Sequence, residues 1–284
     1  MASNIDTSGI SFTAHYTGEV WNQHGLSQPF LSTEKGQQLY RLGRPFEVMA
    51  RVVAGVNNEM PLLQRHHIID HVVETAIKKQ GVSQVVEIAC GLSPRGVSVR
   101  NKFPETTYIE ADLPGMAEKK RAILQQQNLL SEKHQVVNCN ILTTEGNDTL
   151  EAVFAKLDPK KPTLVITEGL VNYFDLPTIS GFWKRLAAIL KTFPSGHYVS
   201  EIYPQLEWHP YVWWTNKFKG LLGRATKANV SLHFSNDQEI ADNFIDYGFN
   251  KIDVLLPESF YGTLNIPVQR VPSIVRVIHA QVNA

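Results

Sequence analysis

The stretch Gln84-Val-Val-Glu-Ile-Ala-Cys-Gly-Leu-Ser-Pro-Arg-Gly96 decides the fold of this chain. Its first half is short and rich in β-branched residues, and its second half is a turn-forming segment that contains Gly91 and Gly96. This order predicts a strand, a tight loop and the start of a helix. In an open sheet of parallel strands, such a loop lies at the carboxyl end of the strand, where ligands bind. We therefore expect a ligand site here, with Gly91 allowing the ligand to approach the backbone closely.

Helices and short apolar strands continue to alternate on both sides of this stretch. Paired apolar residues at helical spacing predict an amphipathic helix over residues 62–79. The last strand, over residues 272–279, should close one edge of the sheet. Further strands are expected over residues 107–112, 135–139, 162–168, 198–202 and 251–255, and further helices over 116–127, 150–157, 179–192 and 237–247. This order predicts an α/β fold: a mainly parallel, doubly wound sheet with helices on both faces.

A single domain boundary is expected, near Gly81. Residues 1–80 should form an N-terminal helical extension or lid, and residues 81–284 the ligand-binding domain. Residues 11–46 and the aromatic insertion 203–218 fit the sheet poorly, so they are the candidates for a lid and a substrate pocket.

Charge and cysteine content narrow the possible partners. The 27 basic and 27 acidic residues balance, so no broad field attracts nucleic acid or an anionic membrane. Cys90 and Cys139 lie in apolar stretches, so their side chains should be buried. Two cysteines are too few for a disulfide framework, which fits a protein of a reducing compartment. The adjacent His66 and His67 point in different directions on a helix and cannot chelate a metal together. We expect a cytoplasmic protein that acts on a small molecule, with no metal, no membrane span and an undetermined oligomeric state.

The glycine loop favours one class of cofactor. A dinucleotide calls for G-x-G-x-x-G, but Ala89 stands two residues before Gly91, so that fingerprint is incomplete. A single glycine suits S-adenosylmethionine, because this cofactor has no pyrophosphate to accommodate. An acid that accepts ribose hydroxyls is expected about 20 residues later, at the end of the second strand. Asp112 fits because it ends that strand, with Glu110 as a competitor on the same face.

Other candidates for cofactor contacts lie at the ends of neighbouring strands. Asn140 and Ile141 follow the third strand, where they could hold adenine. Glu168 follows a very apolar strand and needs a partner if it is buried. Glu87 precedes the glycine loop and joins the cofactor-site candidates.

Residues 84–124 and the stretch Val165-Ile-Thr-Glu-Gly-Leu-Val-Asn-Tyr173 resemble the leucine carboxyl methyltransferase family, which includes bacterial polyketide O-methyltransferases. The resemblance implies a Rossmann-like class I methyltransferase with strand order 3-2-1-4-5-7-6 and the last strand antiparallel. It also implies cofactor contacts at Gly91, Asp112 and Glu168, and at Arg65 for the cofactor's carboxylate. The chain departs from the family where it has Ala89 in place of a frequent glycine, and Asn140 in place of a frequent aspartate.

The resemblance implies O-methylation of a carboxylate or a hydroxyl on a small molecule. A carboxylate acceptor needs no base, whereas a hydroxyl would gain from one, and His15, Tyr16 or His209 could supply it. Two alternatives stay open: an NAD(P)-dependent oxidoreductase on the same sheet, and a protein that binds the cofactor without turnover.

Overall fold

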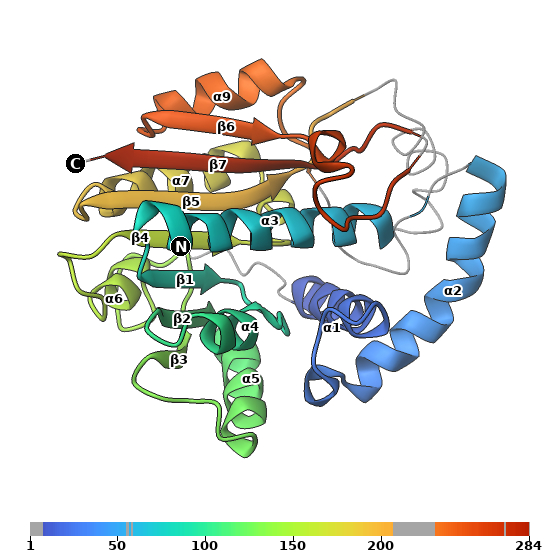
Figure 1. The fold of residues 1–284 in the computed structure, drawn as a ribbon, viewed down its shortest axis with the longest axis horizontal. Helices are drawn as coiled ribbons and strands as arrows, with labels where there is room; N and C mark the ends of the chain where they lie inside the picture. Colours follow the sequence, from blue (N-terminus) through green and yellow to red (C-terminus); the bar gives the residue numbers. More distant parts are fainter. Residues whose placement is uncertain (1–7, 55–56, 58, 207–230, 270, 284) are drawn as a thin grey trace.

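The computed structural model describes residues 8–54, 57, 59–206, 231–269 and 271–283, which form a central sheet covered by helices (Figure 1). The strand order is β3-β2-β1-β4-β5-β7-β6, and β7 runs antiparallel to both of its neighbours. Both the predicted order and the antiparallel strand are therefore confirmed. The strands are β1 (Gln84–Ile88), β2 (Thr107–Asp112), β3 (His134–Asn138), β4 (Thr163–Thr167), β5 (Ser195–Ile202), β6 (Lys251–Leu255) and β7 (Arg276–Asn283).

The expected position of the last strand was wrong. We predicted that it would close an edge of the sheet, but β7 pairs with β5 on one side and with β6 on the other. It also begins at Arg276 rather than at residue 272. The residues of β7 are buried over most of its length, whereas β6 is only partly buried, as expected for an edge strand. A β-branched run predicts a strand, but its place in the sheet depends on which strands it pairs with.

Two apolar layers sandwich the sheet. On one face, Ile68 and Val72 of α3 (Glu59–Gln80) pack against alternate strand residues such as Val85 and Leu164. On the other face, three helices pack against the remaining strand residues, namely α6 (Leu150–Phe154), α7 (Leu176–Leu190) and α9 (Asp237–Asp246). The aromatic side chains of α7 and α9 fill that layer. Further helices are α4 (Arg95–Lys102) and α5 (Pro114–Gln126). The predicted alternation of strands and helices along the chain is confirmed. Apolar layers form on both faces because successive residues of a strand point to opposite faces of the sheet.

The N-terminal segment contributes α1 (Ser8–Gln23), a short 3-10 turn η1 (Pro29–Leu31) and α2 (Glu34–Ala54). Figure 1 shows α1 beyond the end of the sheet to which the parallel strands point, with α2 farther out. Ligands bind at this end of an open α/β sheet. None of the described helices is both long enough and apolar enough to cross a membrane.

Candidate functional site

The loop after β1 and the acid at the end of β2 are joined directly. The backbone N–H of Gly91 donates to Oδ2 of Asp112 at 2.7 Å, and the N–H of Leu113 donates to Oδ1 at 2.8 Å. Burial raises the pKa of Asp112, and these two backbone hydrogen bonds oppose the rise. Each carboxylate oxygen can accept more than one hydrogen bond, so Asp112 keeps capacity for ligand hydroxyls. The structure therefore brings together Gly91 and Asp112, as the sequence predicted.

Gly91 and Gly96 are needed for different physical reasons. Gly91 has a φ of 48°, in the left-handed region, and a Cβ there would lie 3.2 Å from Cβ of Ala14 on α1. Gly96 lies in the first turn of α4, where a Cβ would come within 2.3 Å of Oε1 of Glu110. Gly91 thus lets α1 pack against the loop, and Gly96 lets α4 pack against β2.

Ala89 adopts a conformation that favours glycine. Its φ is 55°, so an L side chain stands in the left-handed region at the position where the family often has glycine. The methyl group of Ala89 therefore costs conformational energy that a glycine would avoid.

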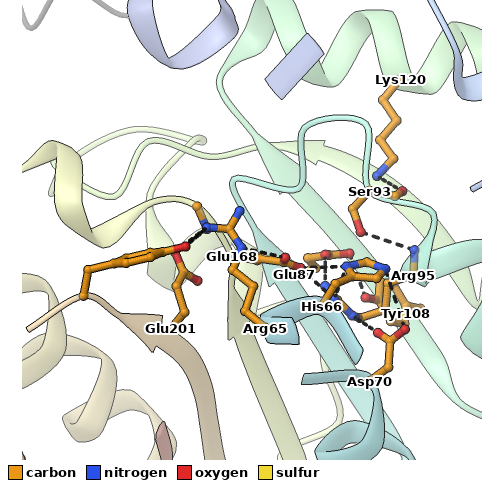
Figure 2. A network of polar contacts seen from close by, with 12 residues as sticks. Arg65, His66, Asp70, Glu87, Ser93, Arg95, Tyr108, Lys120, Glu168 and Glu201 are labelled. Carbon is orange, nitrogen blue, oxygen red and sulfur yellow. Dashed lines mark hydrogen bonds and ion pairs between the residues drawn. The ribbon is translucent and has the colours of Figure 1, made fainter. Parts of the chain in front are cut away.

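Glu168 accepts from two buried arginines. Nε of Arg65 donates to its Oε1 at 3.0 Å, and Nη2 of Arg95 donates to its Oε2 at 2.7 Å (Figure 2). Burial works against the charged form, but His66, Arg95 and Arg65 together hold the pKa of Glu168 well below its usual range. The expectation that a buried Glu168 needs a partner is confirmed.

Arg95 contacts Glu168 and two further acids, although by local sequence pattern it looks like an ordinary helix-start residue. It is 1% exposed, although it begins α4. Its Nε donates to Asp70 at 2.5 Å and its Nη1 to Glu87 at 2.7 Å, in addition to the bond to Glu168. The other oxygen of Glu87 accepts from the hydroxyl of Tyr108 at 2.8 Å. The only sequence signal for Arg95 was its position close after β1.

These contacts join a set of charged residues that we call the ion-pair network: Arg65, His66, Asp70, Glu87, Arg95, Glu168 and Glu201.

Arg65 connects this network to β5. Besides its bond to Glu168, its Nη1 donates to Oε1 of Glu201 at 3.4 Å and to the hydroxyl of Tyr203 at 3.1 Å. Gly169 has a φ of 73°, and a Cβ there would lie 3.1 Å from Nη2 of Arg65. Glu168 therefore binds the guanidinium of Arg65, and Gly169 leaves room for it.

Glu110, the competitor of Asp112, is fully buried in a separate cluster. Its carboxylate forms an ion pair with Lys120 and lies 2.7 Å from Nε2 of His134. Lys120 also donates to the carbonyl of Ser93 at 2.8 Å, so the cluster is hydrogen-bonded to the glycine loop. Glu110 is thus occupied by protein partners, which favours Asp112 as the ligand-facing acid.

More than half of the chain matches a known family. The sequence profile described as leucine carboxyl methyltransferase matches residues 27–185 of the 284. The chain belongs to the leucine carboxyl methyltransferase family. Curated relatives from Mycobacterium tuberculosis and Mycobacterium bovis are named as presumed S-adenosyl-L-methionine-dependent methyltransferases and are 32% identical over 93 residues. The matched segment covers 33% of this chain and 30% of the length of those relatives.

Solved structures agree with this family in fold. A presumed methyltransferase from Thermobifida fusca aligns with a TM-score of 0.59 at 12% identity, covering 99% of this chain and 100% of that one. Magnesium protoporphyrin IX methyltransferase from Synechocystis, with bound SAH, aligns with a TM-score of 0.51 at 13% identity, covering 81% and 89% of the two chains. This leucine carboxyl methyltransferase family member thus has the Rossmann-like class I methyltransferase fold.

The predicted adenine contacts, Asn140 and Ile141, follow β3 and have different surroundings. Asn140 follows β3, and its Oδ1 accepts from the N–H of Leu142 at 3.0 Å. The side chain of Ile141 is buried in the apolar layer that includes α7. Both stand on the Asp112 side of the sheet, because β3 pairs with β2. Their role with adenine stays a prediction.

Two of the three candidate bases, His15 and Tyr16, are neighbours on α1. Nδ1 of His15 lies 2.9 Å from Oγ1 of Thr33, and its Nε2 lies 3.5 Å from Nζ of Lys119. Burial, with the nearby lysines, lowers the pKa of His15 to about 4. The ring of Tyr16 packs 6.3 Å from the ring of Tyr40. His209 lies outside the described residues, as does most of the aromatic insertion.

Proposed function

We propose that this chain transfers a methyl group from S-adenosylmethionine to an oxygen atom of a small molecule. The observation that carries the proposal is the hydrogen bond from the Gly91 N–H to Asp112. It places a loop residue without a side chain beside a buried acid, at the carboxyl ends of β1 and β2. This is where a ligand with ribose hydroxyls is bound in folds of this class.

The residues present fit the cofactor. Asp112 can accept from ribose hydroxyls, and the N–H of Gly91 holds its carboxylate at the end of β2. Nε and Nη1 of Arg65 donate to protein partners, so Nη2 is the nitrogen through which it would bind the cofactor's carboxylate. Asn140 and Ile141 would border the adenine. The bound cofactor supplies an electrophilic methyl group, and the protein aligns the acceptor and excludes water.

We further propose that α1, within the N-terminal extension expected over residues 1–80, is the lid, while α3 packs on the sheet. The lid proposal is supported by the packing of α1 against the loop after β1, where Ala14 faces Gly91 and Gly18 faces Leu92. A lid that closes over ligand should exchange its backbone hydrogens more slowly when ligand is bound. Hydrogen exchange of α1 should therefore slow on addition of S-adenosylhomocysteine, and unchanged exchange would argue against the lid.

Calorimetry tests the cofactor assignment. The intact chain should bind S-adenosylmethionine saturably, and Asp112→Asn should weaken binding at least about tenfold, because a hydrogen bond to a charged group contributes roughly 1.5–3 kcal/mol. Asp253→Asn is the matched control, since Asp253 lies on the edge strand β6 and pairs with the surface residue Lys251. The proposal fails if the intact chain gives no binding heat.

A further inference from the structure

Glu201 is a buried carboxylate near the carboxyl end of β5 that the proposed cofactor contacts do not use. Its Oε1 accepts from the backbone N–H of Gly169 at 2.7 Å and from Nη1 of Arg65 at 3.4 Å. Its Oε2 has no hydrogen-bond partner among the residues that the structure describes. Because Gly169 directly follows Glu168, the carboxylate of Glu201 lies next to the loop that ends β4 (Figure 2).

This oxygen differs from those of the neighbouring acids. Glu168 uses one oxygen with Arg65 and the other with Arg95, and Glu87 uses one with Arg95 and the other with Tyr108. Glu201 is only 1% exposed, so bulk water does not satisfy this oxygen in the ligand-free chain. A buried polar atom without a partner costs free energy and calls for an explanation, such as a ligand that completes it.

The surroundings of Glu201 favour proton exchange near neutral pH. Burial raises the pKa of Glu201 to about 7, with Arg65 acting against the rise and Glu168 adding to it. The titratable groups facing it are Arg65 from α3, Glu168 after β4, Tyr173 in the 3-10 turn η2 (Val171–Tyr173), Tyr198 on β5 itself and Tyr203 just beyond β5. A general base works best when its pKa lies near the working pH.

We propose that Glu201 is the proton acceptor for a neutral hydroxyl substrate, a role that rests on the proposed function. The hydroxyl donates its hydrogen bond to Oε2 and aligns its oxygen for attack. The acceptor oxygen then forms a bond to the methyl carbon while the carbon–sulfur bond breaks, and that electron pair stays on sulfur. The hydroxyl proton passes to Oε2, and the oxygen–hydrogen electron pair stays on the oxygen.

The charge of the network also argues for a neutral acceptor rather than a carboxylate. Arg65, Arg95 and His66 face four acids, namely Asp70, Glu87, Glu168 and Glu201. A substrate carboxylate at Oε2 would lie directly against the carboxylate of Glu201. Like charges in a buried site repel strongly, whereas a hydroxyl satisfies the unpaired oxygen.

Binding of two probes to the full-length chain tests this assignment. With S-adenosylhomocysteine saturating, calorimetry should show phenol bound at least about fivefold more tightly than benzoate at pH 7, a ratio typical of one hydrogen bond. Glu201→Gln should abolish that preference when S-adenosylhomocysteine is kept saturating for each chain. Infrared titration should show a carboxyl group that takes up a proton near neutral pH in the intact chain and is missing from Glu201→Gln. Glu105→Gln, on the surface beside Lys133, is the matched control.

The outcomes separate the two proposals. Failure of the intact chain to bind S-adenosylhomocysteine would refute the cofactor assignment itself. If that ligand binds but benzoate binds as tightly as phenol, or neither probe binds, the role of Glu201 is overturned. A neutral-pH carboxyl titration that persists in Glu201→Gln overturns it as well. Should Glu201→Gln not fold, the phenol preference of the intact chain still decides.

Discussion

The backbone N–H of Gly91 donates to Oδ2 of Asp112 at 2.7 Å, which ties the loop after β1 to the end of β2. The two residues are 21 positions apart in the sequence and meet because β1 and β2 are parallel neighbours in the sheet. Because the bond is made by the backbone N–H, it fixes the position of the loop without needing a side chain at residue 91. The loop can therefore face a ligand on one side and α1 on the other.

Replacement of Gly91 by alanine should destabilise the chain. An alanine at a φ of 48° costs about 1–2 kcal/mol, and its methyl would press on Ala14 of α1. Urea unfolding should show a lower free energy of unfolding, and calorimetry should show weaker S-adenosylmethionine binding. Gly115→Ala is the control, because a Cβ there meets open space in α5 and should be neutral or slightly stabilising. Equal effects of the two changes would contradict the argument.

Ala89→Gly should be tolerated or stabilising. The residue sits at a φ of 55°, so glycine removes about 1–2 kcal/mol of strain but gains entropy in the unfolded chain. The net change in the free energy of unfolding should lie between zero and about 1 kcal/mol of stabilisation. Ala111→Gly, in the interior of β2, is the matched control and should destabilise. Thermal melts of both variants check this, and a clear loss of stability in Ala89→Gly would disprove it.

Arg95→Met should be among the most destabilising single changes. Methionine leaves the buried acids Glu87 and Glu168 without the cation that they share, and breaking one partner of a buried ion pair costs about 3–5 kcal/mol. Arg41→Met, at an exposed position of α2, should change stability little. Urea unfolding of both variants gives the comparison. A loss below about 1 kcal/mol for Arg95→Met would show that the network contributes little.

Stability should fall in acid because of a buried histidine pair. Nδ1 of His197 lies 3.0 Å from Nε2 of His279, and burial lowers the pKa of both to about 4, with Lys251 and, for His279, also His197 adding to the effect. Free histidine titrates near pH 6.5, so the unfolded chain takes up protons first as the pH falls. Each histidine therefore removes up to about 3 kcal/mol between pH 6.5 and 4.

The pair can be tested by replacing one member. Urea unfolding at a series of pH values should show a shallower pH dependence for His279→Gln than for the intact chain. The exposed His71 supplies the control, since His71→Gln should leave the slope unchanged. An identical slope for His279→Gln and the intact chain would remove the pair as the cause.

The sequence by itself determined the alternation of strands and helices, because these depend on local periodicity and turn residues. Lys251–Leu255 was predicted with its observed bounds, and the predicted loop over residues 90–96 is present, although α4 already begins at Arg95. The spacing between Gly91 and Asp112 also followed from the sequence, since one βαβ unit separates them. The resemblance added the strand order, whereas the place of Glu168 after an apolar strand followed from the residues themselves.

Only the tertiary structure decided which distant groups meet. Arg95 reads as an ordinary helix-start residue, and its burial among Asp70, Glu87 and Glu168 depends on three separate segments converging. The place of Arg276–Asn283 inside the sheet, rather than at its edge, likewise depends on strand pairing. Local patterns encode local conformation, whereas burial and charge pairing are properties of the assembled core, and no single segment of the chain contains them.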